Sequence, residues 1–216
     1  ALLLALVTRL PEYHDAVRAG RWQKSAQFCL LDHPITELAG KVMGIVGYGE
    51  LGRSVARLSE AFGMTVMIAA RPGTPAKTGR MPLDDLLRSA DVVSLHCPLT
   101  PQTRNLIGAR ELGLMKAGAI LINTARGGIV DEGALADALS RGVIAGAGID
   151  VLSVEPPVAG NPLLARPIPR LLVTPHIAWA SREARQRMLD EVGRNIRACL
   201  TGSPRNLIGS VDQSRL

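Results

Sequence analysis

KVMGIVGYGELGRSVARL, residues 41–58, is the stretch that decides the fold of this chain. Residues 41–47 are an apolar run that predicts a buried strand, and residues 50–62 predict the helix that follows it. Between strand and helix, Gly47, Gly49 and Gly52 stand at G-x-G-x-x-G spacing. The first permits a tight turn, the second lets the backbone approach a pyrophosphate, and the third lets the helix pack close to the strand. The stretch therefore predicts a dinucleotide-binding turn at a helix N-terminus; the alternative is a glycine turn with a purely structural role.

Strands and helices alternate along the rest of the chain. Strands are predicted at 41–47, 64–70, 91–97, 119–125, 143–151 and 171–176, and helices at 2–19, 50–62, 82–90, 108–115, 131–142 and 181–200. This alternation is typical of right-handed crossovers in a doubly wound parallel α/β sheet. Pro11 marks a second start or a kink in the first helix, Gly142 ends the helix at 131–142, and residues 21–40 predict an irregular arm.

Three polar side chains follow apolar runs that predict buried strands: Arg126 in NTARGGIVDE, Glu155 in DVLSVEPP and His176 in TPHIAWAS. Ligands of parallel α/β sheets bind outside the carboxyl ends of the strands, so these groups are expected on the same rim as the glycine turn. A guanidinium can hold a carboxylate, and an imidazole supported by a carboxylate can carry a proton. Hydride transfer to a 2-keto acid requires such a set. Taken singly, the alternatives are a surface arginine, a glutamate that caps a loop and a histidine in a turn.

The end of the second predicted strand bears on the choice of cofactor. An acidic residue there binds the ribose 2′-hydroxyl of NAD, but this chain has Ala70 followed by Arg71. The missing carboxylate removes repulsion against a 2′-phosphate, and the arginine supplies attraction. The cofactor is thus expected to be NAD or NADP, with NADP or dual use favoured by Arg71; the alternative is that Arg71 is a solvated loop residue.

Composition argues against several other classes of protein. The net charge of +6 comes from scattered arginines without interleaved aromatic residues, which disfavours nucleic-acid binding. The apolar start ALLLALVTRL (1–10) is too short to span a bilayer, so no membrane association is expected. Cys29, Cys97 and Cys199 lack the spacing of a metal site or a disulfide framework, and indicate a reducing, cytoplasmic location.

Five motifs together resemble the D-isomer-specific 2-hydroxyacid dehydrogenases, most nearly the glycerate dehydrogenase (hydroxypyruvate reductase) branch. They are GYGELGRSVARL, HCPLTPQTRNLIG, MKAGAILINTARGGIVDE, GAGIDVLSVEPP and TPHIAWAS. The resemblance implies a Rossmann-type domain in which His176 is the acid/base, Glu155 its partner, and Arg126 the residue that holds the substrate carboxylate. It further implies cofactor contacts from Gly47, Gly49, Glu50, Leu51, Gly52, Arg71, Cys97, Pro98, Thr103, Thr124, Ala125, Arg126, Asp150, His176 and Ala178.

The same resemblance implies a longer protein. Family members have a flavodoxin-like substrate domain, most of which is absent from this chain, so the sequence is expected to be mainly the cofactor domain of something larger. Residues 1–180 are predicted to form the dinucleotide-binding domain, with a linking helix and arm at 1–40. Residues 181–216 would then be a C-terminal helix and tail that return to the substrate domain. A homodimer through 1–40 is expected, with Trp22 and Phe28 at its interface; the alternative is an arm folded on its own domain.

The resemblance implies hydride transfer between NAD(P)H and a small 2-keto or 2-hydroxy acid. The expected conversions are hydroxypyruvate to D-glycerate and glyoxylate to glycolate. Two alternatives remain open. One is a dinucleotide-sensing regulatory module of the same fold, and the other is a fragment that binds cofactor without turnover.

Overall fold

The structure, a computed structural model, describes residues 1–71 and 78–207. It contains two compact units, residues 1–175 and residues 176–216. Within the described residues, no helix is both long enough and apolar enough to cross a bilayer. The first unit carries the sheet and the glycine turn.

Six parallel strands form the sheet of the first unit, in the order β2-β1-β3-β4-β5-β6. Their buried positions are near-continuously apolar, as expected for strands covered on both faces. The doubly wound parallel fold is confirmed, and the strand order reverses between β1 and β3. The strands are β1 (Val42–Val46), β2 (Thr65–Ile68), β3 (Val92–Leu95), β4 (Ile120–Asn123), β5 (Gly146–Ile149) and β6 (Leu171–Val173).

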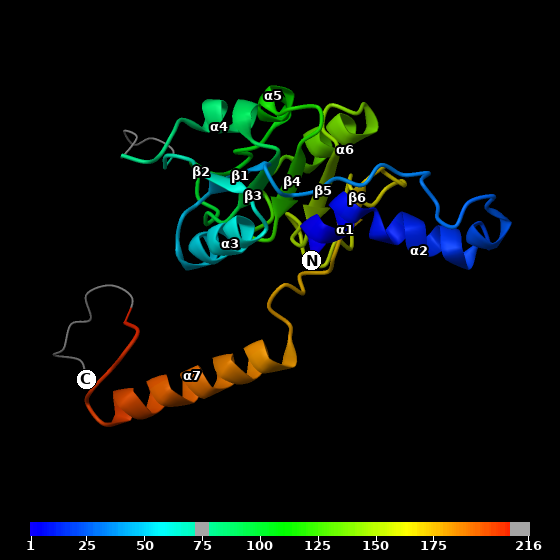
Figure 1. The fold of residues 1–216 in the computed structure, drawn as a ribbon. Coiled ribbons are helices and arrows are strands. Elements are labelled where there is room, and N and C mark those ends of the chain that lie inside the picture. The colour runs from blue at the N-terminus through cyan, green and yellow to red at the C-terminus, as the bar shows by residue number, and fades with distance from the viewer. Residues whose placement is uncertain (72–77, 208–216) are drawn as a thin grey trace. The chain divides into compact units, whose positions relative to one another are not determined.

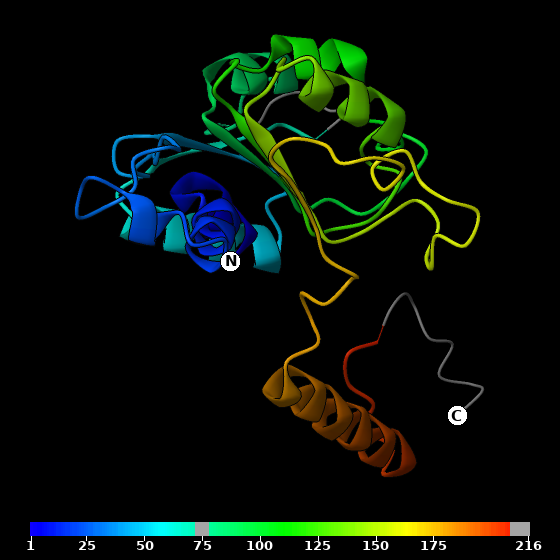
Figure 2. The same ribbon diagram turned by 90° about the vertical axis from the view of Figure 1, so that its right-hand side faces the viewer.

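Helices cover the two faces of this sheet (Figure 1, Figure 2). One face packs against α1 (Leu2–Thr8) and α3 (Glu50–Ala61), with Leu6, Val7 and Ile45 in the core between them. The other packs against α4 (Leu83–Ser89), α5 (Ala109–Leu114) and α6 (Glu132–Ser140), around Leu86 and Leu121. The core consists mainly of aliphatic side chains, as the scarcity of aromatic residues requires.

Asp91 ties three strands together at their amino ends. Its side chain accepts hydrogen bonds from the Val42 amide at 2.8 Å and from Lys116 Nζ at 2.9 Å. Its backbone carbonyl accepts from the Ile120 amide at 3.0 Å. Partial burial alone would raise the pKa of Asp91, but the hydrogen bonds from Val42 and Lys116 outweigh it, so that this pKa lies below its ordinary value.

The N-terminal helix is broken at Arg9, whose φ of 56° is left-handed. The chain restarts as α2 (Leu10–Arg18) with Pro11 in its first turn, which confirms the second start predicted from Pro11. The arm at 21–40 is irregular apart from the 3₁₀ turn η1 (Trp22–Lys24). Tyr13 Oη fastens this arm to α2, because it donates to the His33 carbonyl at 2.7 Å.

The second unit consists chiefly of α7 (Arg182–Leu200). Ser181 caps this helix, since its Oγ accepts a hydrogen bond from the Ala184 amide at 3.1 Å. Glu191 pairs with Arg205 and with Arg194, each through an Nη2 atom at 2.7 Å, which anchors the residues that follow the helix. The apolar side chains of α7, among them Leu189 and Ile196, are exposed.

Candidate functional site

A cleft of about 790 Å³ opens at the carboxyl ends of β1, β2 and β3. It lies where the strand order reverses, the position at which doubly wound sheets bind their ligands. Of the residues predicted to contact the cofactor, Gly47, Gly49, Arg71, Cys97, Pro98 and Thr103 line it. The remaining lining residues were not predicted to contact the cofactor, although Ala70 entered the prediction of cofactor choice; they are Val46, Tyr48, Ala69, Ala70, Arg80, His96, Thr100 and Gln102.

The glycine turn lines this cleft. Gly47 has φ 97°, and a β-carbon there would lie 2.5 Å from the Cys97 amide nitrogen. The residues that follow β1 and β3 can therefore approach this closely only because residue 47 is a glycine. A β-carbon at Gly52 would lie 2.2 Å from the Gly47 carbonyl oxygen, whereas one at Gly49 would meet nothing within 4 Å. Gly52 thus brings helix and turn together, and Gly49 leaves open the space that a phosphate needs.

Helix α3 begins directly after this turn. Gly49 is its N-terminal cap residue and supplies no side chain to the first-turn amides, which are therefore available to an anion. Glu50 and Leu51 are the first two residues of α3 and are exposed. These features fit a dinucleotide whose pyrophosphate lies against the backbone.

The segment that follows β3 adjoins the turn and forms a wall of the cleft. Thr103 is buried, and its Oγ1 donates to the Pro98 carbonyl and accepts from the Thr100 amide, both at 2.7 Å. The buried Thr103 hydroxyl therefore fixes the shape of this wall. His96 lines the cleft, its Nε2 is 2.9 Å from Ser94 Oγ, and burial lowers its pKa. Burial raises the pKa of the Cys97 thiol, so in both groups it disfavours the charged form.

Arg126 lies in a loop shaped by Asn123, the last residue of β4. The buried Asn123 amide donates from Nδ2 to the Arg126 carbonyl at 3.0 Å, and its Oδ1 accepts from the Ala125 amide at 3.1 Å. Arg126 is exposed and its Nη1 donates to the Ala125 carbonyl at 2.6 Å. Thr124 and Ala125, both half-buried, connect strand and arginine. Asn123 was missed as a functional residue, although a polar residue at the end of an apolar run was a signal for it.

Asp150 and Glu155 follow the neighbouring strand, β5. Asp150 is 2% exposed, its amide donates to the Asn123 carbonyl at 2.9 Å, and its carboxylate accepts from the Thr174 hydroxyl. Glu155 is exposed, and its Oε1 accepts from the Leu152 amide at 2.8 Å. The structure therefore brings the turn that carries Arg126 beside the strand that leads to Glu155.

Glu132, the first residue of α6, clamps the loop that carries Glu155. Its carboxylate accepts from the Ser153 amide at 2.6 Å, the Ser153 hydroxyl at 2.7 Å and Asn161 Nδ2 at 2.7 Å. Three bonds on one carboxylate fix both ends of the segment between Ser153 and Asn161. Glu132 was predicted only to lie in a helix, because its partners lie far away along the chain.

His176 and Ala178 belong to the second unit. His176 follows Pro175, the last residue of the first unit, and has a left-handed backbone with φ 53°. Its approach to Arg126 and Glu155 remains a prediction, as does the cofactor contact of Ala178.

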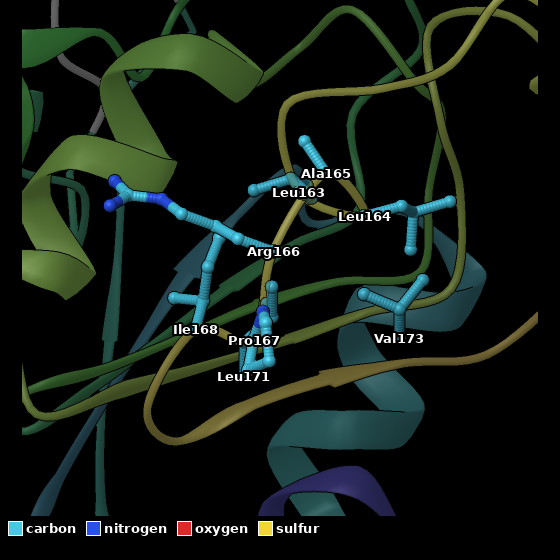
Figure 3. Close-up of a pocket in the computed structure, with 8 residues that line it drawn as sticks. All are labelled: Leu163, Leu164, Ala165, Arg166, Pro167, Ile168, Leu171 and Val173. Carbon is cyan, nitrogen blue, oxygen red and sulfur yellow. The ribbon is translucent and has the colours of Figure 1, made fainter.

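A second hollow, of about 520 Å³, is lined by residues 163–168 with Leu171 and Val173 (Figure 3). Most of these side chains are apolar. The guanidinium of Arg166 extends away toward α6 (Figure 3), where its Nη2 donates to Ser140 Oγ at 3.0 Å. This hollow offers neither a phosphate-binding turn nor a reactive side chain, so we place the candidate site in the cleft beside the glycine turn.

Known proteins are similar to this chain in sequence and in fold. Glycerate dehydrogenase from Methylorubrum extorquens is 49% identical over 207 residues, which are 96% of this chain and 65% of that protein. The crystal structure of the TT0316 protein from Thermus thermophilus matches with a TM-score of 0.82 and 43% identity, over 95% of this chain and 64% of that one. An acyclic imino acid reductase, solved with NADPH and D-Arg, matches with a TM-score of 0.79 and 30% identity, over 96% of this chain and 64% of that one.

The chain thus spans about two-thirds of the length of these relatives. Residues 1–178 match the NAD-binding domain of the D-isomer-specific 2-hydroxyacid dehydrogenases. With the parallel sheet, the glycine turn and this match in agreement, the chain belongs to the D-isomer-specific 2-hydroxyacid dehydrogenase family, whose NAD-binding domain it contains.

Proposed function

We propose that this chain is the cofactor-binding part of an oxidoreductase that transfers a hydride between NAD(P)H and a small 2-keto or 2-hydroxy acid. The conversions are hydroxypyruvate to D-glycerate and glyoxylate to glycolate. One observation supports this best: the loops that carry Arg126 and Glu155 pack together at the carboxyl edge of the sheet that also holds the cleft. The similarity to a glycerate dehydrogenase supports the substrate class.

In this proposal each of three side chains has a separate role at the substrate. The Arg126 guanidinium holds the substrate carboxylate in a two-point contact and polarises the neighbouring carbonyl. The His176 imidazolium donates a proton to the carbonyl oxygen, and takes one from the hydroxyl in the reverse direction. Glu155 accepts a hydrogen bond from this imidazole, orients it and favours its charged form. A bound nicotinamide dinucleotide would supply or accept the hydride.

The cofactor is held, in the same proposal, by the turn, the wall and the loops after β4 and β5. Backbone at Gly49, Glu50 and Leu51 meets the pyrophosphate, and Asp150 lies near the carboxamide. Arg71 favours NADP or dual use, and the similarity to a reductase solved with NADPH supports this. Comparing the affinities of the chain for NADPH and NADH tests the choice. A preference for NADH above tenfold would contradict it.

A steady-state assay with hydroxypyruvate and NAD(P)H tests the activity. Closure of a second domain excludes water and completes such sites, so this chain is expected to bind dinucleotide and to turn over poorly or not at all. His176→Asn should abolish turnover and leave dinucleotide affinity unchanged. Activity that survives this change would show that another group donates the proton. Dinucleotide binding without any turnover would favour the alternatives, a sensing module or a cofactor-binding fragment.

Residues 1–40 are also proposed to form a homodimer interface. Trp22 is 52% exposed and Phe28 is 91% exposed, and these large apolar surfaces support such a contact. Light scattering of the purified chain at tens of micromolar should give the mass of a dimer, and Phe28→Ser should shift it toward the monomer. A monomer for the unaltered chain would exclude this interface.

A further inference from the structure

Arg80 is held beside the end of β2 by backbone pairing. The Met81 amide donates to the Ile68 carbonyl at 3.0 Å, and the Ala70 amide donates to the Met81 carbonyl at 2.7 Å. Ala69 and Met81 form a parallel bridge, and Met81 packs against the core. The backbone at Arg80 is therefore fixed next to Ala70 and Arg71, although these residues are not adjacent in the sequence.

The lining of the cleft is cationic at this end. Arg71 and Arg80 both line it, and among the described lining residues there is neither aspartate nor glutamate. In dinucleotide-binding sheets, the end of this strand meets the 2′ position of the adenosine ribose. A carboxylate at that point would repel a phosphate, but this chain has Ala70 there.

We infer that Arg80 is a specificity-determining residue for the cofactor, and that its guanidinium, together with Arg71, binds the 2′-phosphate of NADPH. This inference rests on the proposed use of NADP and adds a second cation to it. A phosphate monoester carries about two negative charges near neutral pH, so a second guanidinium neutralises charge that Arg71 alone leaves uncompensated. The planar fork of arginine matches phosphate oxygens better than an ammonium does.

Binding of two small ligands to the purified chain, measured by calorimetry, tests this inference without any turnover. The ligands are 2′,5′-ADP, which carries the 2′-phosphate, and 5′-AMP, which lacks it. Arg80→Met keeps the apolar stem and removes the charge. It should weaken 2′,5′-ADP about tenfold or more and change 5′-AMP less than about twofold. Arg80→Lys should recover part of the loss, because it restores charge without the fork.

Arg88→Met is the matched control, since this arginine lies on α4 outside the cleft lining and pairs with Asp85. It should change the affinity for neither ligand.

If Arg80→Met leaves 2′,5′-ADP binding unchanged, or weakens the binding of both ligands equally, the inference is wrong while the role of Arg71 stands. If the unaltered chain binds 2′,5′-ADP no better than 5′-AMP, the proposed use of NADP fails together with the inference. Should Arg80→Met fail to fold, equal affinities of Arg80→Lys and the unaltered chain for 2′,5′-ADP would overturn the need for a guanidinium.

Discussion

Gly127 lies so close to Leu152 that a β-carbon at Gly127 would come within 1.8 Å of the Leu152 carbonyl oxygen. The loop after β4 therefore touches the backbone after β5, immediately beyond Arg126 and just before Glu155. This contact sets the spacing between a candidate substrate-binding cation and a candidate carboxylate. It exists only because residue 127 has no side chain.

Gly127→Ala should lower the free energy of unfolding by about 1–3 kcal/mol, because an overpacked contact against backbone relaxes poorly. Gly113→Ala is the matched control: its β-carbon would meet nothing within 4 Å, and its position inside α5 should make the change neutral or stabilising by up to about 1 kcal/mol. Urea denaturation of both variants measures the difference. Equal stabilities would show that the two loops can separate at little cost.

Glu132→Gln should loosen the segment from Ser153 to Asn161. The amide keeps one acceptor oxygen but loses the charge and the second acceptor that hold three donors, at a cost of about 1–3 kcal/mol. Hydrogen exchange at Ser153 should accelerate. Asp137→Asn, an exposed change on the same helix, should leave that exchange unaltered. Unchanged protection at Ser153 in Glu132→Gln would mean that the loop does not depend on this clamp.

Substitutions in the glycine turn should distinguish effects on cofactor affinity from effects on stability. A methyl group at Gly49 enters open space, so Gly49→Ala should retain its stability while it blocks the approach of a pyrophosphate. A methyl group at Gly52 would collide with the Gly47 carbonyl, so Gly52→Ala should lose stability by about 1–3 kcal/mol as well as affinity. Thermal unfolding and NADH titration of both variants provide the measurements. Normal NADH affinity in Gly49→Ala would contradict the phosphate-binding role of this turn.

Asp91 should make stability depend on pH in the acid range. Its pKa lies below its ordinary value of about 3.9, so its contribution is complete above that value and is lost as the pH falls through the lowered pKa. Asp91→Asn should therefore cost about 1–3 kcal/mol at pH 7 and progressively less toward pH 2. Denaturation at several pH values checks this. The exposed Asp85→Asn should cost no more than about 0.5 kcal/mol throughout. If the loss in free energy of unfolding for Asp91→Asn does not shrink in acid, the effect of this substitution comes from packing and not from charge.

The local features of the fold could be predicted from the sequence because each rests on neighbouring residues. Apolar runs of six to nine residues predicted every strand of the sheet, although each strand is shorter than its run. The largest difference is at 143–151, where the strand is confined to Gly146–Ile149. There Gly142 adopts φ 68° after α6, and the chain needs three further residues to reach the sheet. Arg9 was not expected to break the first helix, because no sequence rule favours a left-handed arginine.

The sequence by itself determined the alternation of strands and helices, the glycine turn and the candidate side chains after each strand. These depend on periodicity and backbone freedom, which act over a few residues. Only the tertiary structure decided that Glu132 reaches Ser153 and Asn161, that Gly127 meets Leu152, and that Arg80 lies beside Ala70. The two members of each pair are distant along the chain, and strand order and register bring them together. Local sequence patterns therefore cannot predict these contacts.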